Sequence, residues 1–146
     1  MAFAEDLKRA CDATKGRAED VVRRSAIAMQ KSMILKTPVD SGRMRANFQC
    51  GLGDINRRNG YLPGSDALSR TAEALLNWKP GQDIYLTNSV PYAKVVEFGL
   101  YGKPPGSANG PKTVGGYSKQ APAGFARLTA QDFSNLLHGA IQGLRT

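Results

Sequence analysis

The sequence predicts an α+β fold in which a small, mostly antiparallel sheet packs against long N-terminal and C-terminal helices. Apolar residues recur every three or four positions near both ends of the chain, which is the period of a helix face. Between them, two short stretches alternate apolar and polar residues, as strands with one buried face do. A glycine- and proline-rich stretch, residues 100–123, precedes the last helix. We expect it to form a long projecting loop or hairpin.

The first predicted helix runs from about residue 4 to residue 36. At ~1.5 Å per residue it would be roughly 45 Å long, which is long for a compact domain, so part of it is expected to pack on another subunit. Gly16 is a weak point that would permit a kink. Cys11 lies on the apolar face and is predicted to be a small buried hydrophobe. That face comprises Leu7, Cys11, Thr14, Ala18, Val22, Ser25, Met29 and Met33.

A corner follows this helix. Pro38 disfavours helical geometry at the preceding residue, so the helix should end near Lys36. Asp40 and Gly42 are typical of a turn, because Asp bonds nearby backbone and Gly tolerates positive φ. From Met44 the alternation predicts a half-buried strand with one face of Met44, Ala46, Phe48 and Cys50 and the other of Arg43, Arg45, Asn47 and Gln49.

The middle of the chain is predicted to contain a loop, a short helix and a second strand. Residues 52–65 have the turn signals of a loop. Ser65 is placed to cap a helix over residues 66–78. The second strand is expected at residues 83–90.

The second strand is predicted to lead into another short helix over residues 91–99. Pro91 suits its first position and Gly99 its end. The last helix is expected to run from Gly124 to about Leu144 and to bury an apolar stripe in the core. The stripe comprises Phe125, Leu128, Phe133, Leu136, Leu137, Ile141 and Leu144.

We predict a single domain spanning residues 1–146. Within it, the stretch before the last helix, at about residues 100–121, is expected to form a flexible arm. Two interpretations stay open: a solvated loop, or an arm that orders against a partner at a cost in entropy. In the second, the residues that contact the neighbour would be Tyr101, Lys103, Lys112, Tyr117 and Lys119.

No constellation of residues in the sequence indicates catalysis, a metal or a cofactor. The two cysteines lie far apart, His138 is the single histidine, and no phosphate-binding glycine motif is present. Glu97 stands out because it lies in the apolar context "VVEFG" and needs a partner, which Arg43 or Arg45 could supply. We interpret such a pair as a structural clasp. The predicted turn and clasp residues are Asp40, Gly42, Arg43, Arg45, Glu97 and Gly99.

The net charge of +8 admits a basic DNA- or RNA-binding module as an alternative function. The charges are scattered, however, and a solvated surface with a basic bias explains them more simply. No apolar run approaches the ~20 residues that cross a bilayer. The N-terminus has early acidic residues and no unbroken apolar segment, so it is not a signal peptide. We expect a soluble protein made and retained in the cytoplasm.

Three segments in order carry a resemblance to a known family. They are "TPVDSGRMRANF", "IYLTNSVPYAKVVEFG" and "QAPAGFARLTAQDF". Together they resemble the small head–tail joining and tail-completion proteins of long-tailed bacteriophages, over most of residues 25–140. Ser41 and Met44 stand where the family pattern has Thr and Leu. The residues that match are Thr37, Pro38, Val39, Asp40, Gly42, Arg43, Arg45, Asn88, Pro91, Tyr92, Ala93, Glu97 and Gly99.

The resemblance implies a structural virion protein without a catalytic site. Such a protein forms a ring, commonly sixfold or twelvefold, at the neck or upper end of the tail. Its implied partners are copies of itself, the neighbouring head-connector proteins, and tail-terminator or tail-tube proteins. DNA would pass through the ring without sequence-specific binding, and assembly would take place in the host cytoplasm. No cofactor and no membrane are implied.

Overall fold

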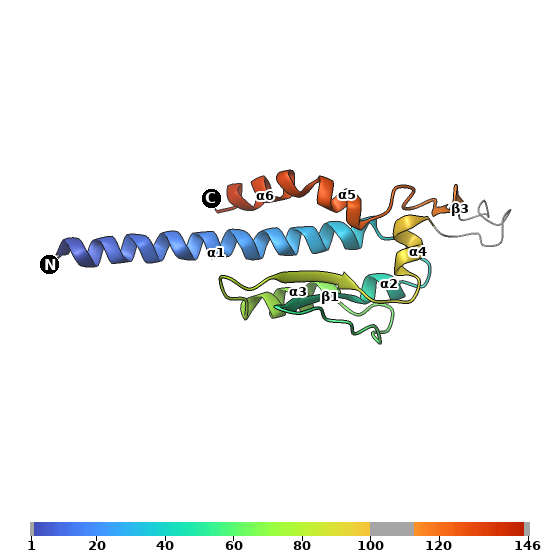
Figure 1. Ribbon diagram of the computed structural model, residues 1–146, viewed down its shortest axis with the longest axis horizontal. Coiled ribbons are helices and arrows are strands. Elements are labelled where there is room, and N and C mark those ends of the chain that lie inside the picture. Colours follow the sequence, from blue (N-terminus) through green and yellow to red (C-terminus); the bar gives the residue numbers. More distant parts are fainter. Residues whose placement is uncertain (1, 100–112, 145–146) are drawn as a thin grey trace.

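The computed structural model describes residues 2–99 and 113–144, and it confirms the predicted α+β class (Figure 1). The small sheet has two antiparallel strands, in which Phe48 pairs with Asn88 and Leu52 with Ile84. The elements in chain order are α1 (Ala2–Lys36), α2 (Arg43–Ala46), β1 (Phe48–Leu52), α3 (Ala67–Leu76), β2 (Ile84–Asn88), α4 (Ala93–Phe98), β3 (Thr113–Val114), β4 (Tyr117–Ser118), α5 (Ala126–Gln131) and α6 (Phe133–Gln142).

Helix α1 is the central element of the body. The pair α5–α6 lies along one side of it, and the sheet with α3 lies on the other (Figure 1). The main core cluster forms where these layers meet α4. In it the rings of Phe48 and Phe125 pack edge to face with centroids 5.8 Å apart, beside Met33, Met44 and Val96.

A second core cluster lies between α1, the sheet and α3. Ala26, Cys50, Leu75 and Trp78 form its buried part. The Gln30 side chain crosses this interface, where its Nε2 donates to the Gln49 carbonyl at 3.2 Å and to Thr71 Oγ1 at 3.1 Å. The two clusters thus fix the C-terminal half of α1 against both neighbouring layers.

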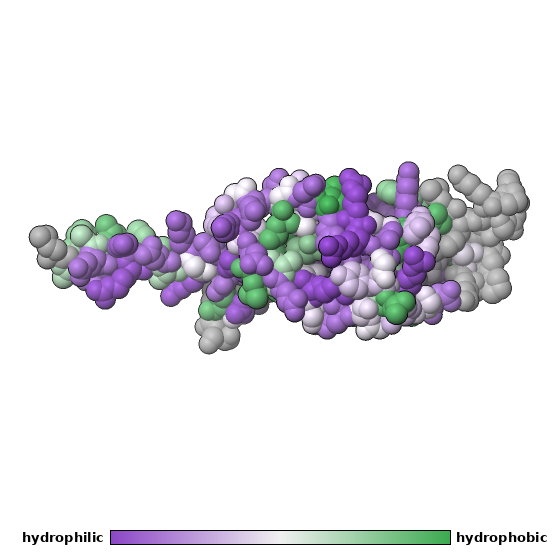
Figure 2. All heavy atoms as spheres, turned by 90° about the horizontal axis from the view of Figure 1, so that it is seen from below, coloured by the Kyte–Doolittle hydropathy of each residue, from purple (hydrophilic) through white to green (hydrophobic). Residues whose placement is uncertain are grey.

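The N-terminal half of α1 projects from the body. Helix α1 is continuous through Gly16, without the kink that its glycine would permit. Every residue from 2 to 18 is exposed, and Figure 2 shows this part of the helix extending beyond the rest of the molecule. The prediction that Cys11 is buried is therefore wrong, because no other element of the body reaches that far along the helix.

The corner after α1 differs from the prediction in one respect. The helix ends at Lys36 and Gly42 adopts φ 84° in the turn, as expected. The strand, however, begins at Phe48, because residues 43–46 form the helical turn α2. Alternation alone could not distinguish these outcomes, since Met44 and Ala46 are buried in either geometry. Strand β1 is also buried on both faces, and not on one as predicted.

The caps and ends of the shorter elements also differ in detail. Asp66, and not Ser65, caps α3, because its carboxylate accepts the Ser69 N–H at 3.0 Å. Pro91 lies in the turn that precedes α4 and not in its first position. Gly99 ends α4 as predicted, with φ 64°.

The predicted C-terminal helix is two helices, α5 and α6, with a break at Asp132. Its apolar stripe is not wholly core. Phe125 is buried, whereas Leu136 and Leu137 are half-buried and Phe133 is 45% exposed. The reason is that α6 is an outer layer that packs mainly on α1, so one side of the stripe is left exposed among the described residues.

The region predicted to form the arm is described in part. Residues 113–118 form the hairpin β3–β4, which lies beside α4. Residues 119–121 of the predicted arm follow the hairpin, and residues 100–112 lie outside the described residues.

Candidate functional site

Glu97 is the centre of the most developed polar site in the described part of the chain. It lies near the C-terminal end of α4, and its side chain is 9% exposed. Its Oε2 accepts the backbone N–H groups of Phe125 and Ala126 at 2.8 and 2.9 Å. Its Oε1 accepts the backbone N–H of Arg127 at 3.0 Å and the Nε of the same residue at 2.9 Å. One carboxylate therefore caps the first turn of α5 from another helix.

These donors control the protonation of Glu97. Burial raises the pKa of the carboxyl group, but the backbone N–H groups of Phe125, Ala126 and Arg127, together with the Arg127 guanidinium, outweigh burial and lower the pKa below its ordinary value. Glu97 is thus an ionised structural acceptor at neutral pH. A general acid or base needs a pKa near the working pH and a free position for the proton, and Glu97 offers neither.

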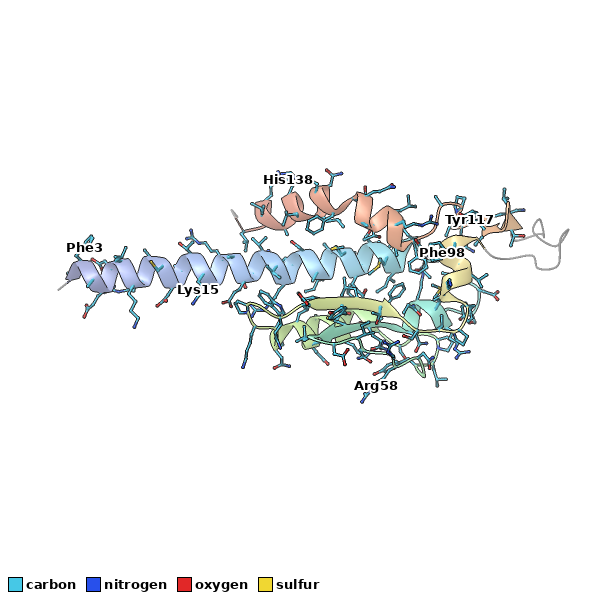
Figure 3. All side chains as sticks on the ribbon, in the orientation of Figure 1. Phe3, Lys15, Arg58, Phe98, Tyr117 and His138 are labelled. Carbon is cyan, nitrogen blue, oxygen red and sulfur yellow. The ribbon has the colours of Figure 1, made fainter. Side chains whose placement is uncertain are left out.

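Arg127 extends the site to the hairpin. Its Nη2 donates to the Glu97 carbonyl. A hydrogen bond with the Tyr117 side chain, followed by the bond with Glu97, raises the pKa of the Arg127 guanidinium. The guanidinium also lies 5.0 Å from the centroid of the Phe98 ring. Figure 3 shows Phe98 and Tyr117 at the same end of the body. We call Glu97, Arg127 and Tyr117 the clasp.

Two glycines allow the clasp to close. A Cβ on Gly99 would lie 2.6 Å from the Tyr117 ring. A Cβ on Gly124, which has φ 86°, would lie 2.8 Å from the Glu97 carbonyl oxygen and 2.9 Å from its Oε2. Both positions therefore require the absence of a side chain, and at both the positive φ also favours glycine.

Two further polar links join distant segments in the same region. The Gln120 side chain forms a pair of bonds with Val39, since its Oε1 accepts the Val39 N–H at 2.7 Å and its Nε2 donates to the Val39 carbonyl at 3.1 Å. The Asn88 Nδ2 donates to the Met44 carbonyl at 2.8 Å. The Gln120 link satisfies both backbone groups of Val39 in an irregular segment, and Asn88 adds a second donor to the Met44 carbonyl, which also accepts the Asn47 N–H.

Asn47 holds the loop of residues 53–66 against the body. The fully buried Asn47 donates from Nδ2 to the carbonyls of Arg43 and Tyr61, both at 2.8 Å, and accepts the Tyr61 N–H at 2.9 Å. The Arg70 guanidinium stacks 3.6 Å from the centroid of the Tyr61 ring. This loop is fixed by side chains from the residue that joins α2 to β1 and from α3.

Arg43 and Arg45, the predicted partners of Glu97, have other positions. Arg45 donates to the carbonyls of Leu35 and Thr37, so it caps the C-terminal end of α1. Arg43 is exposed in the turn. The prediction of the clasp partner is wrong because Arg127, distant in sequence, is brought beside Glu97 only by the packing of α5 on α4.

A groove next to the clasp contains several other predicted residues. It has a volume of about 670 Å³ and lies between the turn after α1, helix α4 and the hairpin. Asp40, Gly42 and Arg43 line one side, and Tyr92 and Lys119 line the others. The predicted turn residues and one predicted arm residue thus meet here. No convergent set of acid, base and nucleophile accompanies them among the lining residues.

The predicted arm residues are placed only in part. Tyr101, Lys103 and Lys112 lie outside the described residues. Tyr117 belongs to the clasp, so in this structure it connects the hairpin to Arg127. Lys119 is exposed beside the groove.

Neither a metal-binding cluster nor a membrane-spanning helix is found among the described residues. No three His, Cys, Asp or Glu side chains of residues 2–99 and 113–144 gather so that they could hold a metal ion. His138 is exposed on α6 (Figure 3). Among the described helices, none is both long enough and apolar enough to cross a bilayer.

Sequence reasoning assigned no polar contact to four residues of this region: Arg127, Gln120, Asn88 and Asn47. All four fall within the segments that carry the resemblance, and Asn88 is among the residues that match the family pattern, which was the one available signal. Arg127 on an amphipathic helix has the appearance of an ordinary surface charge, and Asn47 that of a solvent-facing strand residue. Comparisons with models of protein families, with curated proteins and with solved structures each found no match for this chain.

Proposed function

We propose that this chain is a structural subunit of a long-tailed bacteriophage particle. In this proposal it forms a ring at the neck or upper tail, completes the tail and joins it to the head around the DNA channel. One observation carries the proposal. The three segments that resemble head–tail joining proteins, residues 37–48, 84–99 and 120–133, are bonded to one another pairwise.

Each pair of segments has its own link. Asn88 of the second bonds Met44 of the first. Gln120 of the third bonds Val39 of the first. Glu97 of the second binds the start of α5 in the third. A motif whose polar residues serve to fix segments to each other supports a role in building an assembly.

The state of Glu97 supports a role without catalysis. Its two oxygens already accept four hydrogen bonds, and its pKa is lowered. A ring subunit needs two different contact patches on its sides, which close the ring when the rotation between copies permits. The exposed half of α1 and the half-covered α6 are surfaces available for such contacts.

The test is to remove this chain from the virus that encodes it and to examine the particles by electron microscopy. We expect filled heads and separate tails, with joining restored when the wild-type chain is supplied from a plasmid. The chain should also be found by mass spectrometry in purified wild-type particles. Normal joining without the chain, or its absence from finished particles, would refute the proposal.

The exposed pair Arg57 and Arg58 favours the alternative, a DNA- or RNA-binding module. Both lie on the loop between β1 and α3, and Arg58 points away from the body (Figure 3). That function predicts tight binding to free duplex or single strands that falls steeply with salt. Changing both arginines to Ser would abolish it. In the ring proposal the same change leaves head–tail joining intact unless these residues face the channel.

A further inference from the structure

The N-terminal tip of α1 exposes two large apolar side chains one helical turn apart. Phe3 is 79% exposed and Leu7 is 53% exposed, and the i,i+4 spacing places them on one face. Most helical stability in proteins comes from packing of an amphipathic face, and residues 2–18 are exposed throughout. A partner that covers this face would explain why the chain continues the helix so far beyond its own body.

A groove at the other end of α1 has matching apolar walls. It lies between the C-terminal half of α1 and the start of α3, and has a volume of about 380 Å³. Ile34 and Leu35 line the α1 side, and Ala67 and Leu68 line the α3 side. Leu35 is 62% exposed. An open apolar groove of this size accommodates large side chains from an amphipathic helix.

The charges around the tip and the groove are complementary. Successive residues of a helix are 100° apart, so Asp6 and Lys8 flank the Phe3–Leu7 face on opposite sides. At the groove, Lys31 stands on the α1 wall and Asp66 at the start of α3, and Arg45, which is bonded to the carbonyls of Leu35 and Thr37, is the third charged residue of the lining. A tip inserted in one orientation therefore places Asp6 beside Lys31 and Lys8 beside Asp66.

The tip and the groove of one chain cannot meet each other, because they lie toward opposite ends of one unbroken helix (Figure 1). We infer that the tip of α1 docks in the α1–α3 groove of a second copy of this chain. The contact is head to tail, and it supplies the kind of side contact that a ring requires. The inference rests on the proposed function in that respect only.

A pairing of two tips fits the charges less well. Lys8 and Lys15 lie on the same side of the exposed half of α1, one beside each end of its apolar face. In an antiparallel pair they would face each other and repel. The docked tip alone is smaller than a standard interface of about 1,600 Å², so a single contact should be weak and ring closure should strengthen it.

The experiment compares self-association of the purified full chain by analytical ultracentrifugation over a concentration series. Leu7→Asp alters the tip, Leu35→Asp alters the groove, and Leu76→Asp is the matched control at an exposed leucine outside both. We expect the first two to weaken association at least tenfold and the control to leave it unchanged. Circular dichroism checks that each variant keeps its helix content.

Mixing the two defective chains tests the direction of the contact. Leu7→Asp keeps an intact groove and Leu35→Asp keeps an intact tip, so an equimolar mixture should form dimers that do not grow further. In a second arm, Asp6→Lys and Lys31→Asp should each weaken association, and the chain with both changes should recover it. The two arms test the apolar and the charged halves of the same contact.

Three results would overturn the inference. They are unchanged association of Leu7→Asp and Leu35→Asp, no dimer on mixing, or a wild-type chain that stays monomeric up to about 1 mM. Failure of the proposed function is a separate result, since it is read from particles that join normally without this chain. A ring found in particles whose subunits carry Leu7→Asp would refute the docking contact and leave the proposed function intact.

Discussion

The two halves of α1 belong to one continuous helix and share an apolar period, yet their surroundings differ. Residues 19–36 lie between the α5–α6 layer and the sheet, and Ser25, Ala26, Gln30 and Met33 are buried there. Residues 2–18 carry the same period and are exposed throughout. An amphipathic period thus determines which face of a helix is apolar, while the neighbouring elements determine how far along the helix that face is covered.

Truncating one apolar side chain in each half of α1 should give the largest difference in the free energy of unfolding. Met33→Ala should lower the free energy of unfolding by about 2–5 kcal/mol, because it leaves a cavity in the main core cluster. Leu7→Ala should change it by less than about 0.5 kcal/mol, since the side chain is exposed. Urea unfolding measures both. Equal losses would show that the N-terminal half is packed in the isolated chain.

Loss of the clasp should loosen the α5–α6 layer and so expose the packed half of α1, residues 19–36. Glu97→Ala should destabilise the fold by about 3 kcal/mol, because it leaves buried backbone donors at the start of α5 without an acceptor. Hydrogen exchange should rise in residues 19–36 of α1 once α5–α6 loosens, and stay as it was in residues 2–18. A change near zero would mean that other contacts hold α5 in place.

The pH dependence gives an independent check on Glu97. Its pKa is lowered in the folded state, so its carboxylate stabilises the fold above the unfolded pKa of about 4.3. That contribution is lost as the pH falls through the folded pKa. Glu97→Gln keeps the shape without the charge, so its unfolding free energy should depend less on pH in this acidic window than that of the wild type.

The N-cap of α3 is a further test, because α3 packs on the other side of α1 from the α5–α6 layer. Asp66→Ala should lower the urea midpoint by less than Glu97→Ala does, because it removes the acceptor of the Ser69 N–H and hydroxyl at the exposed start of the helix. Ser65→Ala is the matched control, and it should leave the midpoint unchanged. A larger drop in the urea midpoint for Ser65→Ala than for Asp66→Ala would show that Ser65 is the N-cap.

Deleting residues 2–18 should have the smallest effect on stability. The free energy of unfolding should stay within about 0.5 kcal/mol of the wild-type value, because no buried contact is removed. Self-association should be lost in the same variant, since the tip is absent. A large drop in stability would contradict the description of this half as unpacked in a single chain.

Much of the fold could be predicted because its signals are local. The end of α1 follows from Pro38, the end of α4 from Gly99, and the presence of two strands from alternation, although β1 begins at Phe48 and is buried on both faces. The candidate site was predicted less well. Glu97 was identified by its apolar surroundings, but its partner was assigned to the wrong arginine, since a long-range pairing leaves no periodic trace in the sequence.

Local signals in the sequence were enough for the α+β class, for most of the helices and for the presence of the two central strands. They were not enough for α2 or for the break between α5 and α6. Three features came from the packing of the chain: the start of α5 lies at Glu97, Asn47 and Gln120 bind distant backbone, and half of α1 is exposed. The physical reason is that these features depend on which segments meet in space. Packing of the whole chain selects those meetings, and no single stretch of residues encodes them.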